Sequence, residues 1–130
     1  IETGIYAKYF GNFTTPPKEM QKNVHAAIYG ADYGKNGIKN GPKFYQENAN
    51  LLSKAVTELI NTRGANVFIL GCTELPLILT HVKQNLASKF PNLNINEASG
   101  KDRDIIFIDP MAIMIEHVTE LALASQENIA

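Results

Sequence analysis

Two short apolar runs dominate the pattern of this chain, and neither shows the polar alternation of a half-exposed strand. They are "NVFILG" (66–71) and "DIIFID" (104–109). Continuous apolar runs of this length are typical of strands buried on both faces, as in parallel sheets covered by helices. The segments around them carry apolar residues at helical spacing. The order helix, strand, helix, strand, helix therefore predicts a parallel α/β sheet with right-handed crossovers.

The predicted helices are separated by glycine- and proline-rich loops. The loop "GADYGKNGIKNGP" (30–42) is polar, and its many glycines predict flexibility. Pro76 is compatible with a helix that starts at Leu75, because it falls in the first turn. The predicted helices cover Glu2 to Phe10, Met20 to Ile28, Phe44 to Arg63, Leu75 to about Phe90, and Pro110 toward Ala124.

Length and charge limit the classes of protein to consider. A chain of 130 residues with 45% hydrophobic residues fits one domain, 1–130. The formal net charge of -1 and the scattered basic residues argue against nucleic acid or an anionic membrane as partners. No apolar run is long enough to span a bilayer. A single cysteine is typical of the reducing cytoplasm, which is the predicted location.

The single cysteine, Cys72, follows the first apolar run in "GCTE". Ligands of open parallel sheets bind beyond the carboxyl ends of the strands. A helix starting directly after Cys72 would favour its thiolate through free N–H groups and the helix dipole. Thr73 is the predicted N-cap and Glu74 a first-turn acid. The backbone amides of these residues are suited to hold a carboxylate or an oxyanion.

Other interpretations of these residues stay open. Cysteine is often buried simply as a small hydrophobe. The three histidines are isolated on predicted helices, so surface or capping roles are expected for them, and no spacing predicts a metal site. The glycine-rich loop matches no phosphate-binding pattern. The cations able to reach an anionic ligand lie in this loop or directly after it: Lys35, Lys39 and Lys43.

Several segments resemble the cofactor-independent aspartate/glutamate racemase family. "GANVFILGCTELPLIL" (64–79) resembles its second cysteine motif, and "VHAAIYG" followed by "GIKNG" resembles another segment of the aspartate racemase branch. "ETGIYAKYF" is similar to the segment that opens the second domain, and "FIDP" with its apolar helix to the C-terminus. Glutamate racemases proper usually carry histidine after the Cys-Thr pair, so Glu74 indicates the aspartate or broad-specificity branch.

The resemblance implies a fold and a reaction. Family members are two-domain proteins, so this chain is expected to form one half, a three-layer αβα domain with a mostly parallel sheet. One thiolate removes the Cα proton and a second thiol protonates the opposite face, without pyridoxal phosphate, another cofactor or a metal. The resemblance implies that Cys72 is one base and that Thr73 and Glu74 belong to the substrate-binding site. Lys39, or Lys35 as the alternative, is the implied ligand of the side-chain carboxylate of aspartate or glutamate, and Asp109 is expected to be structural.

The family's first cysteine, in a Cys-Asn-Thr segment, and its substrate-binding arginine are absent from these residues. The chain is therefore expected to be the C-terminal domain of a longer enzyme and inactive alone, with the tail helix 110–130 packing on the missing N-terminal domain. A short strand is expected near Tyr9 to Phe13. Without a central strand, exposed edges and an apolar face predict self-association into a homo-oligomer.

Two alternative functions also follow from the "GCT" element. One is a related decarboxylase or isomerase that uses a single cysteine. The other is a carboxylate-binding or interaction domain that has the fold without catalysis.

Overall fold

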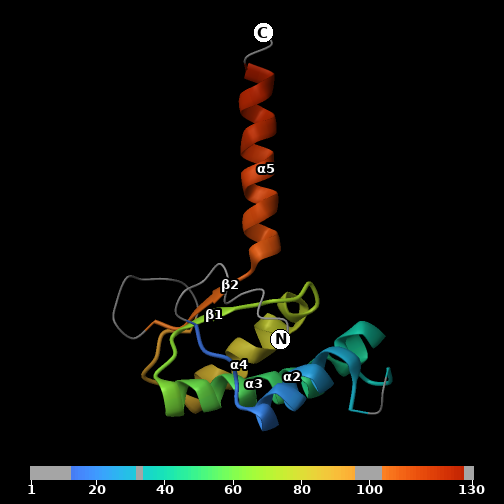
Figure 1. Cartoon of the computed structure of the whole chain (residues 1–130), viewed down its shortest axis with the longest axis vertical. Helices are drawn as coiled ribbons and strands as arrows, with labels where there is room; N and C mark the ends of the chain where they lie inside the picture. Colours follow the sequence, from blue (N-terminus) through green and yellow to red (C-terminus); the bar gives the residue numbers. More distant parts are fainter. Residues whose placement is uncertain (1–12, 32–33, 96–103, 128–130) are drawn as a thin grey trace.

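The computed structural model describes residues 13–31, 34–95 and 104–127. Helices and two short strands alternate as the sequence predicts (Figure 1). The predicted helix at Glu2 to Phe10 lies outside the described residues, as does the predicted strand near Tyr9 apart from Phe13, which is in no strand. The elements are α2 (Lys18–Tyr29), the 3₁₀ turns η1 (Ile38–Asn40) and η2 (Pro42–Phe44), α3 (Tyr45–Arg63), β1 (Val67–Ile69), the 3₁₀ turn η3 (Leu75–Ile78), α4 (Leu79–Lys89), β2 (Ile106–Ile108) and α5 (Pro110–Glu127).

The two strands form a parallel pair, which confirms the predicted direction of the sheet. Phe68 lies opposite Phe107 in the register. The Leu70 amide donates to the Ile108 carbonyl at 2.9 Å, so the ladder continues beyond the strand ends. Parallel strands require a crossover connection, and α4 lies within it.

The core lies between the sheet and helices α3 and α4. On α3, Leu52, Val56 and Leu59 recur at helical spacing and are buried. The helix ends at Gly64, whose φ of +62° is the left-handed conformation that glycine adopts without steric cost. The largest fully buried side chains are Ile38, Ile78, Leu86 and Val82.

The expectation that the strands are buried on both faces is wrong for the described residues. Phe68 points into the core at 8% exposure, whereas Val67 and Ile69 on the other face are 47% and 38% exposed. In Figure 1, α3 and α4 lie on the same side of the strands. The described residues therefore show a mixed α/β fold with a small parallel sheet and a single helical layer on it.

The glycine-rich loop is packed rather than flexible where it is described, which corrects the sequence expectation. The Asn40 side chain accepts from the Gly37 amide at 2.9 Å and donates to the Gly34 carbonyl at 2.8 Å. Asn48, buried on α3, donates to the Asn36 carbonyl at 2.8 Å. Ile38 is buried in the core. These contacts fix the backbone on both sides of Lys39 through groups that no helix or strand pattern reveals.

Gly37 makes this packing possible. Its φ is -83°, so any residue tolerates its backbone conformation. A Cβ at this position, however, would overlap backbone atoms of Ile28, Tyr29 and Gly30. Glycine is therefore needed for the close approach of the loop to the end of α2 and not for a special dihedral angle.

Gly37→Ala is expected to lower the free energy of unfolding by about 2–3 kcal/mol, because backbone must move to admit the methyl group. Urea denaturation measures this change. Gly34→Ala is the control, because a Cβ there meets no neighbour and only its φ of +86° opposes alanine, at about 1 kcal/mol. Equal losses for the two variants would contradict the steric explanation.

The predicted helix from Leu75 to about Phe90 divides into two parts. It opens as the 3₁₀ turn η3, with Pro76 among its first residues, and becomes α-helical only at Leu79. Proline is tolerated there because the first N–H groups of a helical segment have no intrahelical partner. The chain after Cys72 is therefore not an α-helix until seven positions later.

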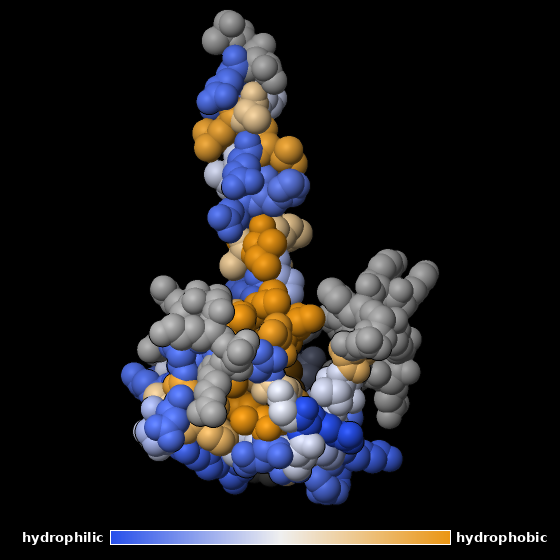
Figure 2. All heavy atoms as spheres, turned by 90° about the vertical axis from the view of Figure 1, so that its left-hand side faces the viewer, coloured by the Kyte–Doolittle hydropathy of each residue, from blue (hydrophilic) through white to orange (hydrophobic). Residues whose placement is uncertain are grey.

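The last helix, α5, begins where the sequence predicts and extends away from the body (Figure 1). Asp109 caps it: its Oδ1 accepts from the Met111 amide at 3.0 Å and from the Ala112 amide at 3.4 Å. This is the structural role expected for Asp109. Side chains of α5 are exposed along its whole length, including its large apolar residues. Figure 2 shows apolar residues gathered where the helix leaves the body.

None of the helices in the described part of the chain is both long and apolar enough to cross a membrane.

Candidate functional site

The residues selected from the sequence meet where two distant segments come together. Cys72, Thr73 and Glu74 follow β1, and Lys39 lies on η1, which contacts η3. Lys39 Nζ is 3.4 Å from Glu74 Oε1, and their side chains are 45% and 23% exposed. The structure thus brings Lys39 to the cysteine loop. Lys35 lies earlier in the glycine-rich loop and is exposed.

Glu74 connects the members of this site. Thr73 Oγ1 donates to Glu74 Oε2 at 3.1 Å, while Lys39 approaches the other carboxylate oxygen. The Cys72 thiol also interacts with the Glu74 side chain, and this interaction raises the pKa of Cys72. One carboxylate is therefore shared by a thiol, a hydroxyl and an ammonium group.

The carboxyl of Glu74 is held in its ionised form. Partial burial by itself raises the pKa of this carboxyl. Hydrogen bonds from Thr73, Cys72 and the backbone, together with the Lys39 charge, outweigh that effect and lower the pKa below its ordinary value. Glu74 consequently carries a negative charge at neutral pH.

The predicted activation of the Cys72 thiolate is wrong for this chain by itself. Burial is the main cause that raises the pKa of Cys72 above its ordinary value, and the Glu74 carboxylate raises it further as hydrogen-bond acceptor and as neighbouring charge. Hydrogen bonds with the Glu74 and Leu75 backbone act in the opposite direction but do not compensate. Cys72 is therefore a thiol at neutral pH, half-buried against the core.

The local backbone explains this difference. Thr73 is not an N-cap: Glu74 precedes η3, no side chain caps it, and the Thr73 hydroxyl donates to the Glu74 carboxylate. A four-residue 3₁₀ turn provides fewer aligned peptide dipoles than an α-helix. Desolvation and a neighbouring anion therefore outweigh the backbone groups that were expected to stabilise the thiolate.

Tyr29, at the end of α2, is part of the same site, although no sequence pattern assigns it a role there. Lys39 Nζ lies 4.7 Å from the centroid of its ring, a cation–π distance. The imidazole ring of His25 also packs on the Tyr29 ring, with ring centroids 4.7 Å apart. The one sequence feature that could have pointed to Tyr29 is its place in "VHAAIYG", upstream of "GIKNG". The spacing of these two segments does not by itself indicate a contact with Lys39.

Histidines do not complete a catalytic pair or a metal site in the described residues. His25 is exposed beside Tyr29, His81 is half-buried on α4, and His117 is exposed on α5. Residues 13–31, 34–95 and 104–127 contain no group of three or more His, Cys, Asp or Glu residues able to hold a metal ion.

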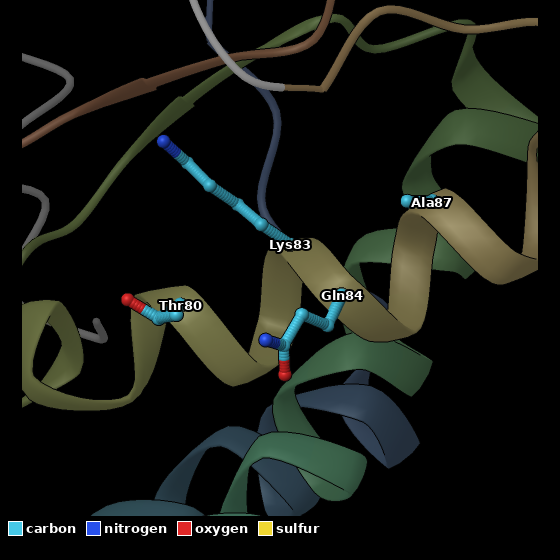
Figure 3. A pocket seen from close by; sticks show the side chains of 4 residues that line it. All are labelled: Thr80, Lys83, Gln84 and Ala87. Carbon is cyan, nitrogen blue, oxygen red and sulfur yellow. The ribbon is translucent and has the colours of Figure 1, made fainter.

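A shallow hollow on α4 lies apart from the candidate site. Figure 3 shows the side chains that line it, with Lys83 extending away from Gln84. None of Cys72, Thr73, Glu74 or Lys39 lines it. The lining residues are Thr80, Lys83, Gln84 and Ala87.

The rate of alkylation by iodoacetamide, measured against pH, is expected to have its midpoint at a higher pH for native Cys72 than for the same cysteine in the urea-unfolded chain. The raised pKa of Cys72 moves the midpoint to higher pH, because only the thiolate reacts. Glu74→Gln should lower the midpoint and speed the reaction at pH 8 by roughly two- to fivefold, because it removes the negative charge. Glu74→Asp, which keeps the charge, is the control. A native midpoint below the unfolded one would contradict the assignment.

No family model matches the chain, and no solved structure matches it.

Proposed function

We propose that this chain supplies one half of the active site of a cofactor-independent racemase acting on aspartate or a related dicarboxylic amino acid. One observation carries the proposal most directly: Lys39 and Cys72, selected from separate motifs, belong to one cluster joined through Glu74. The cluster lies after the carboxyl end of β1, where parallel sheets bind their ligands. A cation for a carboxylate and a thiol for proton transfer are thus available together.

The protonation state of Cys72 suggests its resting role. Racemisation through two bases needs one thiolate and one thiol at the start of each turnover. Because its pKa is raised, Cys72 rests as the thiol and is suited to protonate the Cα carbanion. The second cysteine, supplied by another domain, would remove the α-proton from the opposite face. After this turnover Cys72 is the thiolate and is ready for the reverse direction.

Lys39 and Thr73 have roles in binding on this proposal. The Lys39 ammonium is suited to the side-chain carboxylate of the substrate, because a charge-assisted hydrogen bond fixes both position and orientation. Thr73 is assigned to the α-carboxylate, for which its hydroxyl would have to turn away from Glu74. Precise placement matters because no cofactor delocalises the carbanion.

The proposal also concerns the remainder of the fold. The exposed face of β1, with Val67 and Ile69, has no helical layer on it in the described residues. On the proposed function the first domain and further segments cover this face and α5. They would complete a three-layer domain and place the second cysteine opposite Cys72.

The direct test is racemisation of L- and D-aspartate by a polypeptide that contains residues 1–130 together with the first domain. Circular dichroism follows the loss of optical activity from either enantiomer. We expect conversion in both directions without pyridoxal phosphate or metal, and none by residues 1–130 alone. Absence of conversion in both directions, or full activity of Cys72→Ala, would refute the proposal.

A carboxylate-binding domain without catalysis is the second candidate. The observation in its favour is that the thiol is not activated, whereas the Lys39 ammonium is in place. Calorimetry separates the two: this candidate predicts that aspartate binds equally well to wild type and Cys72→Ala without any turnover. A related decarboxylase or isomerase with one cysteine would instead release a product other than the opposite enantiomer.

A further inference from the structure

Lysine side chains are long and flexible, so a lysine that binds a ligand must be held in place by its surroundings. The backbone of Lys39 is held from both sides, by buried Ile38 and by the side-chain hydrogen bonds of Asn40. Four methylene groups nevertheless separate the ammonium group from the backbone, and the side chain is 45% exposed. Backbone packing alone leaves the charge free to move.

Among the described residues, two side chains contact the Lys39 ammonium. The Tyr29 ring lies 4.7 Å from Nζ, and Glu74 Oε1 lies 3.4 Å from it. The two contacts differ in chemistry. The ring attracts the cation without neutralising it, whereas Glu74 is a carboxylate and occupies the position that a bound carboxylate would take.

Glu74 has other partners if it leaves Lys39. Thr73 Oγ1 donates to its second oxygen, and the Cys72 thiol interacts with the same side chain. A carboxylate ligand arriving at Lys39 therefore exchanges one anionic partner of the ammonium for another, while Glu74 stays bound at the loop. The ion pair is part-exposed, so breaking it costs little.

We infer that Tyr29 is a positioning residue for Lys39, and that Glu74 closes this carboxylate-binding site until a ligand replaces it. The inference deepens the proposed function and rests on it for the identity of the ligand. The ring keeps the ammonium beside the cysteine loop in both states. Glu74 sets how readily a carboxylate enters.

The test uses the single cysteine of this chain as a reporter. Iodoacetate and iodoacetamide both alkylate a thiolate: sulfur bonds to the CH₂ carbon, and iodide leaves. Only iodoacetate carries a carboxylate. The ratio of the two second-order rate constants at one pH therefore reports attraction of a carboxylate to the site, because the fraction of thiolate cancels. Residues 1–130 suffice, and no racemase activity is needed.

The variants separate the roles of the three residues. Lys39→Gln should lower the iodoacetate/iodoacetamide ratio by roughly three- to tenfold through loss of the nearby charge. Tyr29→Leu and Tyr29→Met, which remove the ring, should lower it by roughly two- to fourfold. Tyr29→Phe should keep it within about 1.5-fold of wild type, because phenylalanine retains the cation–π face. A ratio for Tyr29→Phe as low as that of the ringless variants, or ringless variants equal to wild type, would overturn the positioning role.

Glu74 requires a double-mutant comparison, because removing its charge helps any anion to approach Cys72. Glu74→Gln should raise the ratio more in the wild-type background than in Lys39→Gln, and 0.5 M salt should reduce the difference. Equal gains in both backgrounds would overturn the closing role. If these ratios hold but the two-domain protein does not racemise aspartate, the carboxylate site stands and the proposed reaction fails. If the two-domain protein racemises aspartate but these ratios are not observed, only the roles inferred for Tyr29 and Glu74 fail.

Discussion

Cys72→Ser, in a polypeptide with both proposed catalytic cysteines, is expected to lower racemisation of aspartate by at least about 10³-fold, within the range that a positioned acid or base contributes. Exchange of the α-proton with solvent is expected to persist for one enantiomer. The other cysteine can still remove a proton from its own face and return a deuteron there in D₂O. Only transfer to the opposite face depends on Cys72.

Proton NMR in D₂O measures this difference, because the Cα–H signal of each enantiomer disappears on exchange. Wild type should exchange both enantiomers, and Cys72→Ser should exchange one. Thr73→Ser is a suitable control, since it alters a neighbouring side chain but keeps its hydroxyl and both thiols. Equal exchange of both enantiomers by Cys72→Ser would show that Cys72 is not one of the two bases.

Self-association of residues 1–130 through α5 is the second large effect that we expect. The helical repeat places Met111, Ile115, Val118 and Leu121 along one face of α5, at spacings of three and four residues. Leu121 is 58% exposed. The acidic residues of the helix, Glu116, Glu120 and Glu127, lie on the opposite face.

A second copy of the chain is the occupant that this face fits when the proposed first domain is absent. The acidic residues point away from the apolar face, so two such faces can meet without opposing like charges. A groove between α5 and the sheet is also apolar, with Ile69, Ile108 and Met114 in its lining.

Leu121→Glu is therefore expected to convert an associating chain into a monomer in sedimentation velocity experiments. Leu123→Glu is the matched control, because Leu123 is 57% exposed but lies on the side of the helix that carries Glu116 and Glu127. It also places a glutamate three residues after Glu120 and four before Glu127, so it destabilises the helix more than Leu121→Glu. A monomeric wild type, or dissociation in both variants, would contradict pairing through this face.

Much of the fold follows from local sequence patterns. Gly64 ends α3 where the apolar stripe ends, because a left-handed residue there favours glycine. The start of α5 at Pro110, with Asp109 as its cap, follows from similar local chemistry. The parallel pairing of β1 with β2 follows from the helix between them, since a parallel pair needs a crossover. Interactions within a few residues, or a simple topological rule, decide each of these features.

Sequence patterns were less informative about the candidate site. The resemblance favoured Lys39 over Lys35 but left the register of the glycine-rich loop open. The packing of Ile38 and the hydrogen bond from Asn48 decide that Lys39 reaches Glu74. Tyr29 could not be selected, because its contact with Lys39 depends on the path of the loop between them. Side chains that meet through a loop have no fixed spacing in the sequence.

The sequence by itself therefore determined the order of the described elements, the end of α3, the start of α5, the direction of the strands and the place of Cys72 after the first strand. Those features depend on backbone geometry, capping and hydrophobic periodicity, which act locally. Only the tertiary structure decided that one face of the sheet is exposed and that Cys72 rests as a thiol. Exposure depends on which layers surround a strand, and the pKa of Cys72 depends on burial and on the Glu74 carboxylate. Both arise from neighbours in space, whose positions depend on the packing of the whole fold.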